Sequence, residues 1–215
     1  MADLRIVDYA SLLAQVAEHL NRQDMTDQIP VAVQHAEEMF NDEIRWRKML
    51  AHVVTDDVGE TDEAYENLPS DFLELKSIRF NTDPVVVPGY LNPRQLEQYR
   101  AAHFDEGGTP FHYTIVGTQL LFDRVPTDDP ELDLLYYAQI PALNATNPTS
   151  NLLLDEHPGI YLYGTLLHME PFLKNDARLA TWTALYQSRR DQLHRADRRA
   201  EQAPGPLRIT TQGHF

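Results

Sequence analysis

Cysteine is absent from this sequence of 215 residues, and its absence excludes several classes of protein. A disulfide-stabilised scaffold, a thiol nucleophile and a thiolate metal site all require cysteine, whereas a protein of a reducing compartment does not. Long apolar runs are also absent, so we expect no membrane-spanning segment. The opening residues, MADLRIVDYA, lack the basic and apolar regions of a signal peptide, and we expect none.

The sequence motifs of common enzymes are missing as well. There is no HExxH metal motif, no GxSxG nucleophile elbow, no P-loop and no dinucleotide fingerprint. The nine histidines show no metal-ligand spacing, and we interpret His157 as a helix cap and His168 as a satisfied core or interface residue. Paired acids such as Asp128 and Asp129 lie in turn-like contexts, which is weak evidence for acid-base catalysis. We therefore expect a protein that is not an enzyme and uses no cofactor or metal.

Lysine and arginine are few, and they are unevenly distributed. Residues 1–177 carry 30 acidic side chains against 11 Lys and Arg, a net charge of −19. Residues 178–215 carry 7 Arg against 3 acids, a net charge of +4. An acidic body argues against general nucleic-acid binding, which depends on neutralising phosphates. The asymmetry predicts a basic end that binds a partner.

The densest apolar stretch runs from residue 147 to residue 173 and predicts a central buried helix. Its middle part carries no charged side chain, and apolar residues occupy every side of a helical wheel, which is typical of a buried helix. Pro158 suits the first turn after the cap, Pro171 should end or kink the helix, and Gly164 would let another backbone approach. The residues that we expect to pack in this helical core are Tyr161, Tyr163, Gly164, Leu167, Trp182 and Tyr186.

Helical and strand periodicities alternate along the rest of the chain. Asp8 should cap a first amphipathic helix, and a second should begin at Thr26 or Asp27 and end near Leu50. Residues 68–80 predict a tight turn followed by a strand, and further strands are predicted at 85–87, 113–116, 119–122 and 132–140. A short surface helix is predicted at 93–102. Gly117 suits a type II′ hairpin turn, and the helical pattern returns after Pro141.

This order of elements predicts an α+β fold. We expect a helical bundle, made of the N-terminal helix pair and the C-terminal helices, with an inserted small and mostly antiparallel β domain. The last helix should begin at Asn175 or Asp176. The predicted parts are 1–50 for the helix pair, 51–141 for the β domain with its short helix, 142–202 for the C-terminal helices and 203–215 for an extended tail.

The tail LRITTQGHF is apolar at Leu207, Ile209 and Phe215 and too short to fold alone. Two interpretations stay open for it. It is either a frayed terminus or an extended strand that pairs with another subunit.

Three segments together carry a resemblance to a known family. They are YENLPSDFLELKSI (65–78), LLYYAQIPALNATNPTSNLLLDEHPGIYLYGTLLHMEPFLKNDAR (134–178) and APGPLRI (203–209). In this order they resemble the head-to-tail adaptor, or connector, proteins of short-tailed bacteriophages, and the likeness runs over nearly the whole chain. The resemblance implies a structural protein of the virion neck and tail, assembled in the host cytoplasm, without a membrane partner.

The same resemblance implies partners and residues. Such adaptors form a dodecameric ring below the portal protein and connect it to the tail or nozzle protein, and DNA passes through the ring without specific binding. Their C-terminal segment reaches into the portal. Carried over to this sequence, the portal-binding residues are Arg198, Arg199, Pro204, Pro206, Leu207, Arg208, Ile209 and Phe215. Because a basic bore would attract phosphates, we expect acids from residues 1–177 to line the channel.

Three other functions remain open at this point. Another virion component, such as a tail-completion or stopper protein, would contact the distal tail instead of the portal. A small hydrolase would use Glu156, His157 and Tyr161, which would have to converge in a concave pocket. A DNA-binding regulator would use the arginines between residues 189 and 199.

Overall fold

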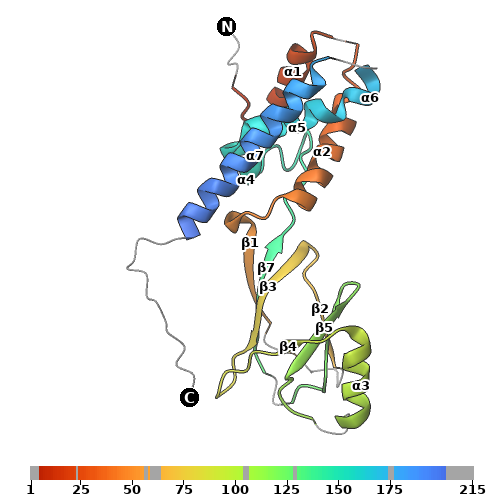
Figure 1. Ribbon diagram of the computed structural model, residues 1–215, viewed down its shortest axis with the longest axis vertical. Helices are drawn as coiled ribbons and strands as arrows, with labels where there is room; N and C mark the ends of the chain where they lie inside the picture. The colour runs from red at the N-terminus through yellow and green to blue at the C-terminus, as the bar shows by residue number, and fades with distance from the viewer. Residues whose placement is uncertain are drawn as a thin grey trace. The chain divides into compact units, whose positions relative to one another are not determined.

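A computed structural model describes residues 5–22, 24–55, 58, 64–103, 107–127, 130–173 and 177–201. Within these ranges, seven α-helices and two small sheets form an α+β fold (Figure 1), which confirms the predicted class. The chain divides into two compact units. The helical unit consists of Met1–Trp46 and Ile140–Phe215, and the β unit is Arg47–Gln139.

Some predicted features lie outside the described residues. They are the tail 203–215, the start of the last helix at Asn175 or Asp176, and the paired acids Asp128 and Asp129.

The helical unit is organised around α5 (Pro158–His168), as the apolar stretch predicts. Figure 1 shows α5 among helices that pack against it, namely α1 (Tyr9–Leu20), α2 (Ile29–Glu43), α4 (Leu152–Glu156) and α7 (Leu179–Glu201). His157 is its N-cap residue and Pro158 lies in its first turn, as predicted. The helix ends at His168, and the short α6 (Glu170–Leu173) contains Pro171, whose missing amide hydrogen prevents α5 from continuing.

The first two helices begin in different ways. Asp8 caps α1 as predicted, because its carboxylate accepts a hydrogen bond from the Ser11 N–H at 2.8 Å while its own N–H donates to Ser11 Oγ at 2.9 Å. The start predicted for the second helix, Thr26 or Asp27, is wrong, because α2 begins at Ile29. The residue before α2 is Gln28, whose side chain forms no cap, and Pro30 occupies the first turn.

The predicted end of the second helix near Leu50 is also wrong. Helix α2 ends at Glu43, Ile44 is extended, and Leu50 begins a strand. The Arg45 side chain provides hydrogen bonds to backbone carbonyls at the end of the helix, since its Nη1 donates to the carbonyls of Asn41 at 2.6 Å and Ile44 at 2.9 Å. Apolar periodicity continues past this point because Ile44 remains fully buried, so the pattern alone does not mark the end.

The close approach at Gly164 comes from a side chain and not from a backbone, contrary to our prediction. A Cβ at this position would lie 2.6 Å from both Cε1 and Cζ of Phe40. The Phe40 ring is fully buried, stands edge-on to Tyr161 at a centroid distance of 5.0 Å, and stacks on Tyr186 at 6.1 Å. Of the expected core residues, Tyr161, Gly164, Trp182 and Tyr186 are buried, and Tyr163 and Leu167 are half-buried.

The sequence predicts helix again after Pro141, but the segment before α4 is irregular and the helix begins only at Leu152. Side chains of α2 bind its backbone: Ile140 N–H donates to Asn41 Oδ1 and Leu143 N–H donates to Glu37 Oε1, both at 2.8 Å. These bonds hold the segment in a non-helical path. Asn151 then caps α4.

The β unit contains two sheets. The first has the order β1 (Leu50–Thr55), β7 (Leu132–Ala138), β3 (Phe72–Phe80) and is antiparallel. The second has the order β2 (Tyr65–Asn67), β6 (Gln119–Phe122), β5 (His112–Val116), β4 (Gly89–Tyr90), and only its β4–β5 pair is parallel. A 3₁₀ turn (Arg47–Met49) precedes β1, and α3 (Pro93–His103) packs on β5. A mostly antiparallel arrangement was predicted, and it is confirmed.

Local signals in the β unit predict two features correctly and one wrongly. Gly117 has φ = 61° and Thr118 does not have a positive φ, as a type II′ turn between β5 and β6 requires. Asn92 opens α3 as its cap. The strand predicted at 85–87 is reduced to one bridge between Phe80 and Val86, because the prolines on both sides have no amide hydrogen to donate.

A buried acid connects the three strands of the first sheet. Asp133 on β7 accepts hydrogen bonds from His52 Nε2 on β1 at 2.6 Å and from Arg79 Nη2 on β3 at 2.5 Å. Burial by itself raises the pKa of the Asp133 carboxyl, but the hydrogen bonds from Arg79 and His52 outweigh it, so the net shift is downward.

The core of the β unit is a cluster of buried apolar side chains: Val58, Ile78, Phe80, Leu120, Phe122, Leu132, Leu134 and Tyr136.

Candidate partner-binding surface on helix α7

Helix α7 has an inner face that fixes its position against the rest of the helical unit. Trp182, Tyr186 and Leu193 are buried and recur at helical spacing. Arg190 forms an ion pair with Glu43 of α2 at 2.6 Å, and the Tyr186 hydroxyl donates to the same carboxylate at 3.0 Å. The first two-thirds of α7 is therefore anchored by both apolar and polar contacts.

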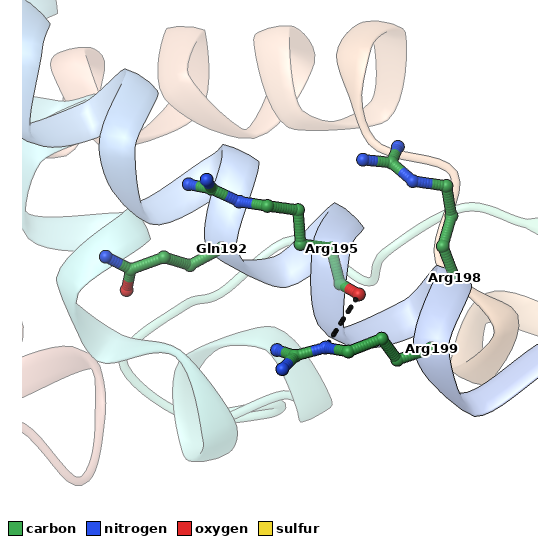
Figure 2. A pocket seen from close by; sticks show the side chains of 4 residues that line it. All are labelled: Gln192, Arg195, Arg198 and Arg199. Carbon is green, nitrogen blue, oxygen red and sulfur yellow. Dashed lines mark hydrogen bonds between the residues drawn. The ribbon is translucent and has the colours of Figure 1, made fainter.

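The last turns of α7 carry an arginine cluster, defined here as Arg195, Arg198 and Arg199. With Gln192 these side chains line a surface hollow of about 680 Å³ (Figure 2). Arg195 Nε donates to the Asp191 carbonyl at 3.1 Å and Arg199 Nε donates to the Arg195 carbonyl at 3.3 Å. Figure 2 shows the Arg195 and Arg199 side chains lying back along α7 toward its N-terminus, as their bonds to the carbonyls four residues earlier require.

None of these three arginines forms an ion pair with a carboxylate of the described part of the chain. A guanidinium presents a planar fork of N–H donors that matches a carboxylate or phosphate. The cluster is therefore able to bind an anionic group of another molecule.

A second hollow, of about 510 Å³, lies between the start of α5 and α7. Gln192 and Arg199 line both hollows, so the two share a border. Gly159 provides room there for the Arg189 side chain, whose Nε lies 3.5 Å from the position that a Cβ would occupy. An alanine at 159 would make an ordinary van der Waals contact with this arginine.

His194 on α7 lies near both arginines and acids. The pKa of His194 is lowered, first by burial and then by the charges of Arg190 and Arg198, while Asp191 and Asp197 act in the opposite direction. The arginines thus prevail over the nearby acids. This agrees with the prediction from sequence of a basic end on an acidic chain.

The structure accounts for only part of the predicted portal-binding set. Arg198 and Arg199 are exposed in the last turn of α7. The others, Pro204, Pro206, Leu207, Arg208, Ile209 and Phe215, lie outside the described residues. Arg195 was expected only as one of the arginines between residues 189 and 199, and Gln192 was not expected. Arg195 lies three and four residues before Arg198 and Arg199, and Gln192 lies three residues before Arg195, so these side chains share one side of the helix.

The three residues considered for hydrolysis do not converge. Tyr161 is fully buried, and its hydroxyl donates to Glu37 Oε1 at 3.2 Å and accepts from Asn151 Nδ2 at 2.6 Å. His157 stands edge-on to Trp46 at a centroid distance of 5.2 Å, and Glu156 is exposed. The Tyr161 hydroxyl is therefore part of a buried structural network.

His168 differs from its predicted satisfied state. Its Nε2 is buried without a hydrogen-bond partner among the described residues. Burial lowers the pKa of its imidazole, the nearby His35 lowers it further, and Glu38 opposes the shift. Across the described ranges, no three His, Cys, Asp or Glu residues are grouped as a metal site would need, and no helix has the length and apolarity to span a bilayer.

The described residues form an α+β fold with a cationic helix end that suits an anionic partner. A family model described as SU10 adaptor protein matches residues 7–210, so the chain belongs to the SU10 adaptor protein family. The match confirms the resemblance to phage head-to-tail adaptors and identifies a phage adaptor, a structural component of the virion. No curated protein matches the sequence.

Proposed function

We propose that this adaptor forms a ring below the portal protein and connects it to the tail, as the resemblance implies. The observation that carries the proposal is the arginine cluster at the end of α7, which projects from a chain with a net charge of −15. The cluster directly precedes the C-terminal segment that would reach into the portal. A cationic helix end on an otherwise acidic chain suits a protein that must bind one protein partner and repel DNA.

The proposed portal contact combines charge and apolar burial. Arg198 and Arg199 would bind carboxylates of the portal, and exposed ion pairs of this kind are each worth only about 0.2–1 kcal/mol. The affinity therefore depends on the apolar residues Leu207, Ile209 and Phe215, whose full burial would contribute about 1.5–3 kcal/mol each. Under this division, the arginines determine register and the terminal segment supplies most of the binding energy.

The ring would surround the path of the DNA with negative charge. Duplex DNA carries one charge per about 1.7 Å of its axis, so a basic bore would bind it and slow its passage. Residues 1–177 have a net charge of −19, which supports an acidic bore. Repulsion acts over about 8 Å at physiological salt, enough to keep phosphates off the wall.

Removal of residues 203–215 tests the portal contact. The truncated chain should fold, as judged by circular dichroism, and should lose stable binding to the portal of the same phage in a sedimentation assay. The double substitution Arg198→Ala and Arg199→Ala should weaken binding less than the truncation. A matched control, Lys76→Ala with Arg94→Ala on the β unit, removes the same charge and should bind like the wild type.

The result that would refute the portal assignment is full docking by the truncated chain. Binding to the distal tail in place of the portal would instead indicate a stopper or tail-completion protein. We also expect the free subunit to be monomeric and the ring to assemble on the portal, since that template supplies part of the binding energy. Dodecamers seen by electron microscopy at micromolar concentration without portal would contradict this expectation.

A further inference from the structure

Two helices of the helical unit carry exposed charges of opposite sign at the same spacing. Glu38 and Asp42 are exposed on α2 and lie four residues apart. Arg195 and Arg199 are exposed on α7 and are also four residues apart. Four residues correspond to about 6 Å along a helix, so an arginine row and a carboxylate row of this kind match each other in register.

The acidic row points away from α7. The side of α2 that faces α7 is marked by Glu43, which binds Arg190 and Tyr186 of α7. At about 100° per residue, Asp42 lies about 100° and Glu38 about 140° around the α2 axis from Glu43. Val31 lies on this same outer side, about two turns before Glu38, and is 43% exposed.

The arginine row in turn points away from α2. Arg190 marks the side of α7 that faces α2. Arg195 lies about 140° and Arg199 about 180° around the helix from Arg190. The two rows are therefore on outward sides that face away from the α2–α7 contact, and they cannot pair within one subunit. They are positioned to pair between subunits.

Building on the ring of the proposed function, we propose that a second copy of this chain docks here. Arg195 of one copy binds an acid of the α2 row of the next copy, Glu38 or Asp42, and Arg199, one turn further along α7, lies where this contact meets the portal-binding surface. Because each copy offers a different patch on each side, the contact is heterologous and repeats around a ring. Exposed ion pairs determine register more than affinity, so the contact should weaken as salt increases.

Residue-specific crosslinking tests the pairing directly. A carbodiimide joins an amine to a carboxylate without a spacer, so Arg195→Lys would make the site reactive while keeping its charge. In portal-bound rings assembled from mixed ¹⁴N and ¹⁵N subunits, we expect crosslinks between light and heavy chains that join position 195 to Glu38 or Asp42. The matched control Arg94→Lys, on α3 of the β unit, should yield no crosslink to these acids. Rings that lack the 195 crosslink would overturn the proposal.

Charge reversal provides a second, independent test. Arg195→Glu leaves Arg198 and Arg199 in place, so single subunits should still bind the portal while complete rings become at least tenfold rarer in electron micrographs. Adding Glu38→Arg to the same chain should restore rings. If Arg195→Glu forms normal rings at both low and high salt, this interface is refuted while the proposed function still stands. If the wild type itself forms no ring on the portal, the proposed function fails together with this inference.

Discussion

Replacing Glu37 by leucine should destabilise the helical unit by about 2–4 kcal/mol. The Glu37 side chain is buried in α2, and its Oε1 accepts hydrogen bonds from Leu143 N–H at 2.8 Å and from the Tyr161 hydroxyl at 3.2 Å. Leucine accepts neither, and a buried donor without a partner costs about 1–3 kcal/mol. Two such donors give about 2–6 kcal/mol, and removal of a buried carboxylate offsets part of this loss, which leaves the lower half of the range.

Tryptophan fluorescence during urea unfolding is the appropriate assay. Trp46 and Trp182 are both buried in the helical unit, so the signal reports on the unit that contains Glu37. The control is Glu38→Leu, a neighbouring exposed position where the change should stay within about 0.5 kcal/mol. Glu37→Gln retains an oxygen acceptor and should keep most of the stability. The reasoning is refuted if Glu37→Leu unfolds like the wild type, or if Glu37→Gln loses as much as Glu37→Leu.

The same residue predicts a dependence of stability on pH. Burial raises the pKa of the Glu37 carboxyl, and the hydrogen bonds from Leu143 and Tyr161 only partly oppose this. The folded chain then holds this proton more tightly than the unfolded chain does. The resulting stability is fully present below the ordinary glutamate pKa and is lost as the pH rises through the raised pKa. The wild type should therefore lose stability relative to Glu37→Gln over that window, and a pH-independent difference would contradict this.

Two further substitutions test the packing of each unit. Gly164→Ala places a Cβ 2.6 Å from the fully buried Phe40 ring. The overpacking cost of about 1–3 kcal/mol should exceed the gain of about 1 kcal/mol in helix propensity and lower the melting temperature, whereas a raised melting temperature would show that Phe40 can move. Asp133→Asn removes the charge that Arg79 and His52 bind, and should destabilise the β unit by about 1–2 kcal/mol in urea unfolding followed by circular dichroism. Because the pKa of Asp133 is lowered, this difference should vanish as the pH falls through that pKa, and its persistence in acid would contradict the assignment.

Local signals in the sequence were sufficient for the fold class and for several element boundaries. The cap at Asp8, the proline that opens α5 and the hairpin glycine at 117 each depend on the conformational preference of one or two residues. Such preferences hold almost wherever the segment lies in the fold. The family resemblance also rests on the sequence alone, since it follows from quoted motifs and the match covers residues 7–210.

The tertiary structure decided which distant residues meet and which side of a helix remains open. In the sequence nothing distinguishes Glu37 from the other acids of its helix. Only packing brings it to Leu143 and Tyr161, more than a hundred residues away. Gly164 predicts a close approach but does not identify Phe40 as its neighbour. Likewise, the arginine count predicts a basic end, whereas the outward direction of Arg195 follows from how α7 packs on its neighbours. Periodicity fixes positions around one helix axis, but the rotation of that axis against other helices is a property of the assembled core.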